Sequence, residues 1–172
     1  LATGGQWSGG LGVFTPNNNT LNAVYQPTSS EINSGTLNLV LSTTGNGNCV
    51  SESDDVDIAF TASPTVDAGL PQSTCSTTPA ATLSGVVAIA GGGVWSGGLG
   101  TYSPNNTSLN TTYTPSAAEI TSGSVLLYLT TTGNGNCNPE VDSVLITITP
   151  SPTVSAGADQ SVCYNNSSVN LG

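Results

Sequence analysis

The stretch SVLLYLTTTGNGNCNPEVDSVLITIT, residues 124–149, decides the fold class. Residues 124–130 and 142–149 are rich in β-branched and apolar side chains that alternate with polar ones, as strands with one buried face do. Between them, Thr-Gly-Asn-Gly-Asn-Cys at residues 132–137 supplies the glycines and asparagines typical of a turn. The stretch therefore predicts a β-hairpin and an all-β fold.

The hairpin pattern occurs twice in the chain. Cys49 returns as Cys137 and Cys75 as Cys163, each 88 residues later, and residues 1–84 align with residues 89–172 without a gap. Of these 84 aligned pairs, 44 are identical. A gapless repeat of domain length indicates one folded unit copied in tandem. Such a chain usually gains length or valency rather than a unique active site.

The rest of the repeat contains further short strands. The candidates in the second copy are residues 82–90, 93–96, 100–103 and 109–113, separated by glycine clusters and a Pro-Asn-Asn stretch. A helical turn is expected only at residues 116–120, where Ser and Glu stand three apart as in a capping box. About seven short strands and one early tryptophan per repeat predict tandem β-sandwich modules of the immunoglobulin type.

The core of each sandwich follows from the alternation within strands. Leu127 and Leu129 are two apart, as are Val144 and Ile146, so each pair shares one face of its strand. These four residues and Trp95 are predicted to face inward. Trp7, the counterpart of Trp95, is predicted to be core as well. The alternative for both tryptophans is a platform on which a carbohydrate stacks.

Proline marks the predicted domain boundaries near residues 63 and 151, because it cannot donate to a ladder and stiffens a short connection. The predicted domains are residues 1–63, a module without its first strands; residues 64–151, a complete module; and residues 152–172, the first strands of a third module. The sequence opens in mid-repeat, which leads us to expect a piece of a longer chain.

The charge balance excludes several function classes. The chain has no Lys, Arg or His, and ten Asp and Glu residues give a net charge of −10. Nothing can neutralise phosphates, so binding to nucleic acid or to anionic lipid is not expected. Lysine Schiff bases and histidine general bases are missing, and the chain is predicted not to be an enzyme. No run reaches the roughly 20 apolar residues of a membrane helix, so no membrane insertion is predicted.

Two cysteines per repeat suggest disulfides and an oxidising, extracellular compartment. Three pairings compete. Cys75 with Cys137 lies within one module, but these residues are expected about 26 Å apart along a strand, whereas a disulfide tolerates at most about 7 Å between Cα atoms. Cys49 with Cys75, and Cys137 with Cys163, would require the chain to fold back at residues 63 and 151. The favoured pairing joins the first-strand cysteine of one module to the hairpin cysteine of the following module.

Four motifs together resemble a known family. They are Ala-Gly-x-x-Gln-Ser-x-Cys (residues 68–75 and 156–163), Trp-Ser-Gly-Gly-Leu-Gly, Tyr-x-Pro-x-x-x-Glu-Ile and Thr-Thr-Gly-Asn-Gly-Asn-Cys. The chain resembles the PKD-like, immunoglobulin-like repeats of giant Bacteroidetes surface proteins, which include gliding-motility adhesins exported by type IX secretion. The resemblance covers essentially the whole chain. It implies an extracellular stalk or filament on a bacterial cell surface, with no catalytic residues and no cofactor.

The acidic residues of the hairpins are the remaining candidates for chemistry. Glu52, Asp54, Asp55 and Asp57 lie in the first hairpin, but only Glu140 and Asp142 recur in the second, which argues against a glycosidase pair. Glu52, Asp54, Glu140 and Asp142 are weak candidates for calcium ligands, with solvated carboxylates as the simpler interpretation. Asp142-Ser143-Val144 resembles the short O-glycosylation motif of Bacteroidetes, which makes Ser143 a glycosylation candidate.

These observations predict a structural, non-enzymatic stalk that extends a distal binding element from the cell. Its expected partners are neighbouring modules of the same chain or like chains in a filament. Two alternatives stay open. One is a multivalent module in which the repeated Asn-, Thr- and Gly-rich loops bind surface glycans. The other is the subunit of a self-assembling extracellular fibre.

Overall fold

The structure, a computed structural model, describes residues 1–165 and 168–171. The chain divides into two compact units. Unit 1 comprises residues 1–63 and 135–138, and unit 2 comprises residues 64–134 and 139–172. Apart from two short helices, all the regular structure in the described residues is β-strand.

The larger sheet of unit 2 is built on the predicted hairpin. Its strand order is β10 (Gly92–Ser96), β13 (Ser124–Thr132), β14 (Val141–Thr149) and β7 (Gln72–Cys75). β13 and β14 pair antiparallel, which confirms the predicted hairpin. β7 runs parallel to β14 on its other side, with Cys75 opposite Thr149.

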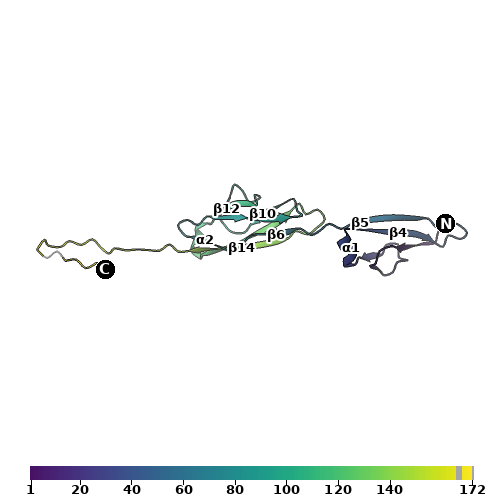
Figure 1. Cartoon of the computed structure of the whole chain (residues 1–172), viewed down its shortest axis with the longest axis horizontal. Coiled ribbons are helices and arrows are strands. Elements are labelled where there is room, and N and C mark those ends of the chain that lie inside the picture. The colour runs from purple at the N-terminus through teal and green to yellow at the C-terminus, as the bar shows by residue number, and fades with distance from the viewer. Residues whose placement is uncertain (166–167, 172) are drawn as a thin grey trace. The chain divides into compact units, whose positions relative to one another are not determined.

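A second layer covers one face of this sheet. It consists of β11 (Thr101–Ser103), β12 (Asn110–Thr114) and β8 (Ala81–Ser84), and β12 and β14 lie in different layers of unit 2 in Figure 1. The short strands β6 (Thr65–Asp67) and β9 (Val86–Ala88) form a separate pair. Leu83 and Tyr113 of the second layer share one buried cluster with Trp95, Leu127 and Ile146 of the larger sheet. Unit 2 is therefore a β-sandwich, and the predicted fold class is confirmed.

The alternation along β13 and β14 explains which face is buried. Leu127, Leu129, Val144 and Ile146 are all 0% exposed. Their neighbour Leu145 is 41% exposed, because successive side chains of a strand point to opposite faces. The alternation of apolar and polar residues in the sequence thus gives the hairpin one buried face and one exposed face.

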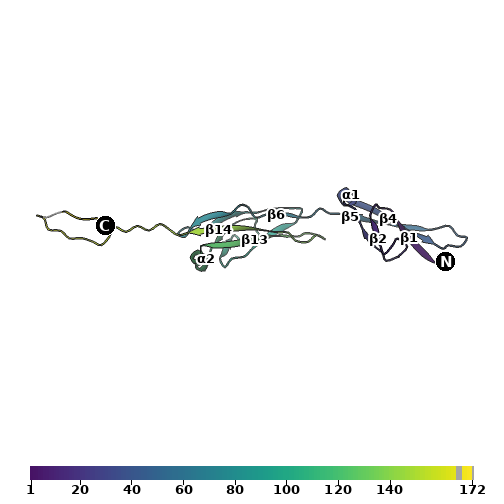
Figure 2. The same ribbon diagram turned by 90° about the horizontal axis from the view of Figure 1, so that it is seen from below.

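Unit 1 repeats part of this arrangement. Its sheet, labelled in Figure 2, has the order β1 (Gly4–Ser8), β4 (Thr36–Thr44) and β5 (Ser53–Ala59). The short strands β2 (Val13–Thr15) and β3 (Val24–Gln26) form a separate antiparallel pair. Trp7 stands opposite Leu41 in β4, just as Trp95 stands opposite Leu129 in β13. Equivalent residues of the two units therefore share the same strand register.

One predicted strand is divided in the structure, and one predicted turn is a short helix. The prediction of a single strand over residues 82–90 is wrong, because the chain breaks at Gly85 between β8 and β9. A Cβ on Gly85 would collide with the Leu129 side chain, so the backbone passes closely over the core there. The expected turn at residues 116–120 is the helix α2 (Ala117–Ser122), which Ser116 caps and Gly123 ends at φ +80°. Its counterpart in unit 1 is α1 (Ser29–Ser34).

The segment after Ser151 is exposed throughout its described residues and forms no strand of its own there. Val154 is 99% exposed and Leu171 is 88% exposed. Residues 166, 167 and 172 of the predicted third module lie outside the described residues. The assignment of residues 152–172 to the first strands of a third module stays a prediction.

Candidate functional site

The most highly connected polar group of unit 2 is the Glu119 carboxylate, which is only 7% exposed. One oxygen, Oε1, accepts from the Leu99 backbone N–H at 2.8 Å and from the Tyr113 hydroxyl at 2.8 Å. The other, Oε2, accepts from the Ser116 backbone N–H at 2.7 Å and from its hydroxyl at 2.8 Å. The Tyr113 hydroxyl in turn accepts from the Gly100 backbone N–H at 2.8 Å. We call Tyr113 and Glu119 the Tyr–Glu centre.

Electrostatics at this centre favour the ionised carboxylate. Burial raises the pKa of Glu119, but hydrogen bonds donated by the backbones of Ser116 and Leu99 and by the Tyr113 hydroxyl outweigh it. The pKa of Glu119 therefore lies below its ordinary value. Burial, together with the hydrogen bond to Glu119, raises the pKa of Tyr113 to about 12, so the phenol stays protonated and remains a donor.

The glycines of the Trp-Ser-Gly-Gly-Leu-Gly motif make room for the centre. A Cβ on Gly98, which has φ +71°, would collide with the Tyr113 hydroxyl, and a Cβ on Gly100 would collide with the Thr114 carbonyl oxygen. The sequence pointed to Glu119 only as a capping-box residue and did not pair it with Tyr113. The signal that could have revealed the centre is the fixed spacing between the glycine motif and the Tyr-x-Pro-x-x-x-Glu motif, which recurs in both copies.

Unit 1 contains the same arrangement around Glu31. The Tyr25 hydroxyl donates to Glu31 Oε1 at 2.7 Å, and the Leu11 backbone N–H donates to the same oxygen at 2.6 Å. Desolvation raises the pKa of Glu31, yet the hydrogen bonds from Thr28, Tyr25 and Leu11 bring it down to about 2. Each carboxylate thus ties a loop, a strand and a helix N-terminus together. Both of its oxygens are already occupied by donors, which suits a structural role rather than proton transfer.

The two tryptophans occupy equivalent places with different burial. Trp95 is 0% exposed and its indole N–H donates to the Leu109 carbonyl at 3.2 Å, so its ring cannot serve as a platform for a sugar. Trp7 is half-buried, and its indole N–H donates to the Leu21 carbonyl at 3.1 Å. The ring of Trp7 is less covered because unit 1 has fewer strands over the same face in the described residues.

The carboxylates of the four calcium candidates do not come together at one site. Glu52, Asp54 and Glu140 are exposed, and the Asp142 carboxylate accepts a hydrogen bond from the Ala68 backbone N–H at 2.8 Å. Within residues 1–165 and 168–171, no three Asp, Glu, Cys or His side chains group in a way that could hold a metal ion. The Asp142 contact has a clear structural use, since it fixes the start of the module to its hairpin.

The glycosylation candidate Ser143 lies on β14 opposite Tyr128, with its side chain exposed. That exposure leaves its hydroxyl reachable from solvent. The backbone of Ser143 is held in the β13–β14 ladder rather than presented on a loop.

Cys75 and Cys137 lie near opposite ends of β14. We call the end where β6 begins and where the β13–β14 loop lies the N-terminal pole, and the end where β7 and β14 finish the C-terminal pole. Cys75 is at the C-terminal pole, with its Sγ 3.4 Å from the Ser151 Oγ. Cys137 lies in the β13–β14 loop and precedes Val141, the first residue of β14. The nine residues of β14 span about 30 Å, far beyond the reach of a disulfide.

All four cysteines are free thiols in this structure. Hydrogen bonds from the Ser151 and Thr77 hydroxyls lower the pKa of Cys75 to about 7. A thiol with this pKa is substantially ionised near neutral pH and attacks disulfides readily. The pairing of the first-strand cysteine with the hairpin cysteine of a following module stays a prediction.

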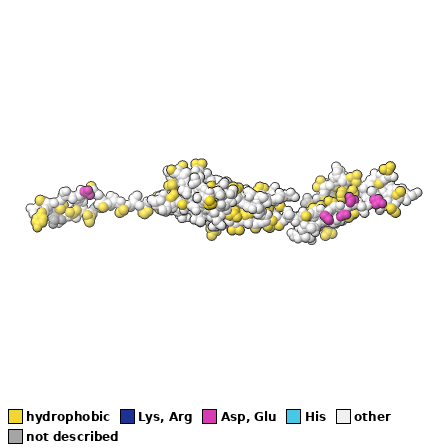
Figure 3. Space-filling model, turned by 90° about the horizontal axis from the view of Figure 1, so that it is seen from above, with side chains coloured by type: hydrophobic (Ala, Val, Ile, Leu, Met, Phe, Trp, Pro, Cys, Tyr) yellow, Lys and Arg dark blue, Asp and Glu magenta, His cyan; other side chains and the backbone are white. Residues whose placement is uncertain are grey.

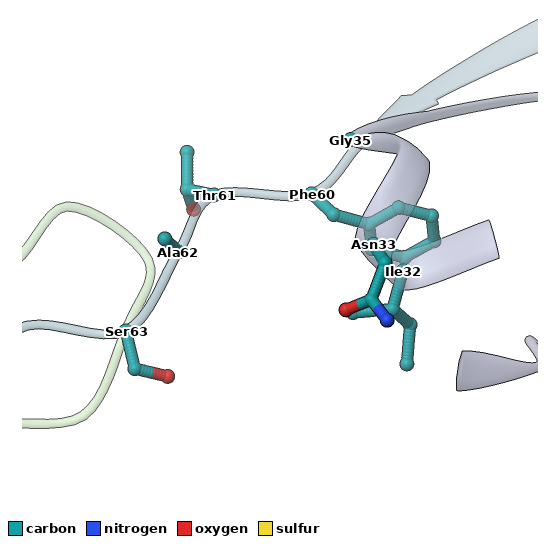
Figure 4. A pocket seen from close by; sticks show the side chains of 7 residues that line it. All are labelled: Ile32, Asn33, Gly35, Phe60, Thr61, Ala62 and Ser63. Atoms are coloured by element: carbon teal, nitrogen blue, oxygen red, sulfur yellow. The ribbon is translucent and has the colours of Figure 1, made fainter. Parts of the chain in front are cut away.

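Two cavities of unit 1 lie along β5. The larger has a volume of about 460 Å³ and lies between α1 and the chain that follows β5, as Figure 4 shows. Its lining residues are Ile32, Asn33, Gly35, Phe60, Thr61, Ala62 and Ser63. The smaller has a volume of about 190 Å³. Its lining residues, at the other end of β5, are Leu41, Thr43, Glu52, Ser53 and Asp54.

Comparison with known proteins identifies no family. No protein-family model matches the sequence, and no curated protein sequence matches it. Similar solved structures include mouse clustered protocadherin PcdhgC3 EC1-3, at 11% identity and a TM-score of 0.42, and mouse cadherin-23 EC22-24, at 12% identity and a TM-score of 0.39. The matches cover 86% and 85% of this chain, but 56% and 53% of those chains. At these TM-scores the likeness carries no argument, so the fold rests on the strand pairing and core described above.

Proposed function

We propose that this chain is a structural part of an extracellular bacterial surface adhesin, in which tandem immunoglobulin-like modules form a stalk that carries a distal binding element. The observation that carries the proposal is the position of the two ends of a module. The Ala68 backbone N–H, near the start of unit 2, donates a hydrogen bond to Asp142 at the N-terminal pole. β14 ends with Thr149 at the C-terminal pole. Each added module therefore starts at the pole where the previous one ends.

The chemistry of the surface supports the same proposal. The chain offers no basic side chain, and on the face drawn in Figure 3 most of the visible acidic side chains lie over unit 1. The buried carboxylates Glu31 and Glu119 are occupied by structural hydrogen bonds. No helix in the described part of the chain is long and apolar enough to cross a membrane.

The stalk proposal predicts that length grows with the number of modules. Only a few residues, among them Pro64, separate β5, which ends at Ala59, from β6, which begins at Thr65, and we expect this short joint to restrict bending. Small-angle X-ray scattering on arrays of two, four and six modules should give a maximum dimension that rises linearly with module number. The six-module array in urea serves as the flexible control. A dimension that stays nearly constant as modules are added would contradict the stalk.

The stapled-junction pairing of the cysteines has its own test. Two copies of residues 1–172 joined through residues 85–88 keep the repeat phase. The first copy retains Cys75 and Cys163, the second retains Cys49 and Cys137, and the other cysteines are replaced by serine. After oxidation with oxidised glutathione, peptide mapping should find Cys75 linked to Cys49 and Cys163 linked to Cys137.

The reversed fusion is the matched control. Its first copy retains Cys49 and Cys137 and its second copy retains Cys75 and Cys163, so no hairpin cysteine follows a first-strand cysteine. The staple predicts four free thiols there. A Cys163–Cys49 peptide in the first fusion would instead reveal pairing within one module and would refute the stapled junction.

A further inference from the structure

The strands β7 and β14 of unit 2 run parallel, and this orientation decides how the module responds to a pull on its two ends. Gln72 stands opposite Ile146, and Cys75 stands opposite Thr149. The chain reaches β7 from the N-terminal pole, where Ala68 is bonded to Asp142, and β14 ends at the C-terminal pole. A pull on both ends of the module therefore drags β7 and β14 along their common axis in opposite directions.

The direction of a load on two paired strands decides how their hydrogen bonds break. These bonds lie across the strands, in the direction in which neighbouring strands are spaced. When the strands are dragged along their axis, all the bonds of the pair are strained together. When the strands are pulled apart from one end, the bonds break one after another. The parallel orientation of β7 and β14 therefore gives the more resistant of the two loading directions.

The pair β7–β14 is the weaker of the two contacts that hold β14. On its other side, β14 pairs with β13 along residues 141–147, and its inward side chains Val144 and Ile146 are 0% exposed. β7 is only four residues long, and none of its residues is fully buried. Under an axial load β14 should stay with β13, so the resistance of the module depends on how firmly β7 is held.

Hydrogen bonds outside the ladder reinforce the pair at both of its ends. Just before β7, the Ala68 backbone N–H donates to the Asp142 carboxylate at 2.8 Å. Just after β7, the Ser76 backbone N–H donates to the Thr149 carbonyl at 2.8 Å, and the Ser151 backbone N–H donates to the Ser76 hydroxyl at 3.0 Å. The short strand is thus fastened at its entry and at its exit.

The bond at the entry is the stronger kind. Hydrogen bonds donated by the backbones of Ala68 and Ser143 hold the pKa of Asp142 below its ordinary value, so the carboxylate is ionised at neutral pH. Hydrogen bonds to an ionised acceptor are about twice as strong as neutral ones. A load on the start of the module meets this bond before it reaches the β7–β14 ladder.

We propose that the β7–β14 pair, with the Asp142–Ala68 and Ser76–Ser151 contacts at its ends, bears the load when the two ends of the module are pulled apart. We call this set of contacts the β7–β14 clamp. It keeps the module folded, and therefore at constant length, while the chain is under tension. The use of the clamp on a cell rests on the proposed stalk function, whereas its resistance is a property of unit 2 alone.

Single-molecule force spectroscopy on the full chain tests the direction of loading. In two variants all four cysteines are replaced by serine and two thiols are introduced as handles. The axial variant carries Ser63→Cys and Thr153→Cys, at exposed positions before and after the module. The transverse variant carries Thr77→Cys and Thr153→Cys. Thr77 and Thr153 follow the ends of β7 and β14, so the transverse load peels the two strands apart.

At one constant force, unit 2 should unfold at least about tenfold more slowly with axial than with transverse handles, because several hydrogen bonds must break together. The gain in length, about 3.5 Å for each residue between the handles, identifies the event as the unfolding of unit 2. Urea denaturation should give the two variants the same stability, which isolates the effect of direction. Equal unfolding rates in the two directions would overturn the proposal.

These outcomes are separate from those of the scattering experiment on module arrays. Arrays that lengthen linearly, with modules that unfold equally fast in both directions, would keep the stalk and overturn the clamp. Arrays of constant dimension, with slow axial unfolding, would overturn the stalk and support the clamp.

A pair of point variants tests the contact at the entry. With axial handles, Asp142→Ala should raise the unfolding rate at constant force at least about tenfold, because it removes the charged acceptor for Ala68. Thr111→Val is the matched control. Thr111 is 4% exposed, and its hydroxyl donates to the Ser103 and Asn105 carbonyls at 3.0 Å, within the second layer.

Both substitutions remove a hydrogen bond and should lower the stability in urea, but Thr111→Val should leave the unfolding rate under axial load nearly unchanged. Circular dichroism checks that both variants are folded. If the two variants accelerate unfolding under load equally for the same loss of stability in urea, the contact at Asp142 bears no particular load and the proposal is overturned.

Discussion

Replacing Trp95 by alanine is expected to lower the free energy of unfolding of unit 2 by about 3–5 kcal/mol. The ring is 0% exposed and lies in the shared cluster with Leu83, Leu129 and Tyr113, so its removal leaves a cavity between the two sheets. The indole N–H also gives up its hydrogen bond to the Leu109 carbonyl. Urea denaturation followed by circular dichroism measures the loss.

Trp7→Ala is the matched control, because Trp7 has the same place in the repeat but is only half-buried. Its cost should be well below that of Trp95→Ala. A loss of less than about 1 kcal/mol for Trp95→Ala would mean that the ring does not contribute to the core. That result would restore the carbohydrate-platform interpretation.

Replacing Glu119 by glutamine is expected to lower the free energy of unfolding at neutral pH by about 2–3 kcal/mol. Glu119 accepts from Leu99, Tyr113 and Ser116 through both oxygens, and the amide nitrogen of glutamine would face donors instead of accepting from them. Glu140→Gln, at an exposed position of the same unit, is the control and should change stability by less than about 0.5 kcal/mol. Equal effects of the two substitutions would contradict the Tyr–Glu centre.

The stabilisation from Glu119 should also depend on pH. Its pKa in the folded state is lowered from 4.5, so the stabilisation is fully present above about pH 4.5 and is lost as the pH falls through the folded pKa. For Glu31 the folded pKa is about 2, which places the loss for unit 1 between about pH 4.5 and about pH 2. The difference in unfolding free energy between wild type and Glu119→Gln should shrink over the acidic range. A difference that stays constant down to about pH 2 would rule out the ionised carboxylate as its source.

Much of the fold could be predicted because its signals are local. The alternation in residues 124–130 and 142–149, the turn at residues 132–137 and the 88-residue offset all lie within short stretches or in a direct comparison of the two copies. The break at Gly85 could not be predicted in this way. It arises because the backbone passes close to the Leu129 side chain, which is distant in sequence.

The centre around Glu119 shows the same limit. The sequence predicted its capping role through Ser116, which is three residues away. It did not predict the contacts with Leu99 and Tyr113, because they form only when the glycine loop, β12 and α2 meet. The separation of Cys75 and Cys137, in contrast, could be predicted, because the length of one strand sets it.

The sequence by itself determined the all-β class, the tandem repeat, the inward face of the hairpin and the absence of basic side chains, because these follow from residue type and short-range periodicity. Only the tertiary structure decided that the repeated spacing of glycine, tyrosine and glutamate builds a buried hydrogen-bonded centre. It alone decided that Trp95 is fully buried and that its indole N–H donates to the Leu109 carbonyl. Burial and strand pairing depend on which distant segments meet in space, and no single stretch of sequence carries that information.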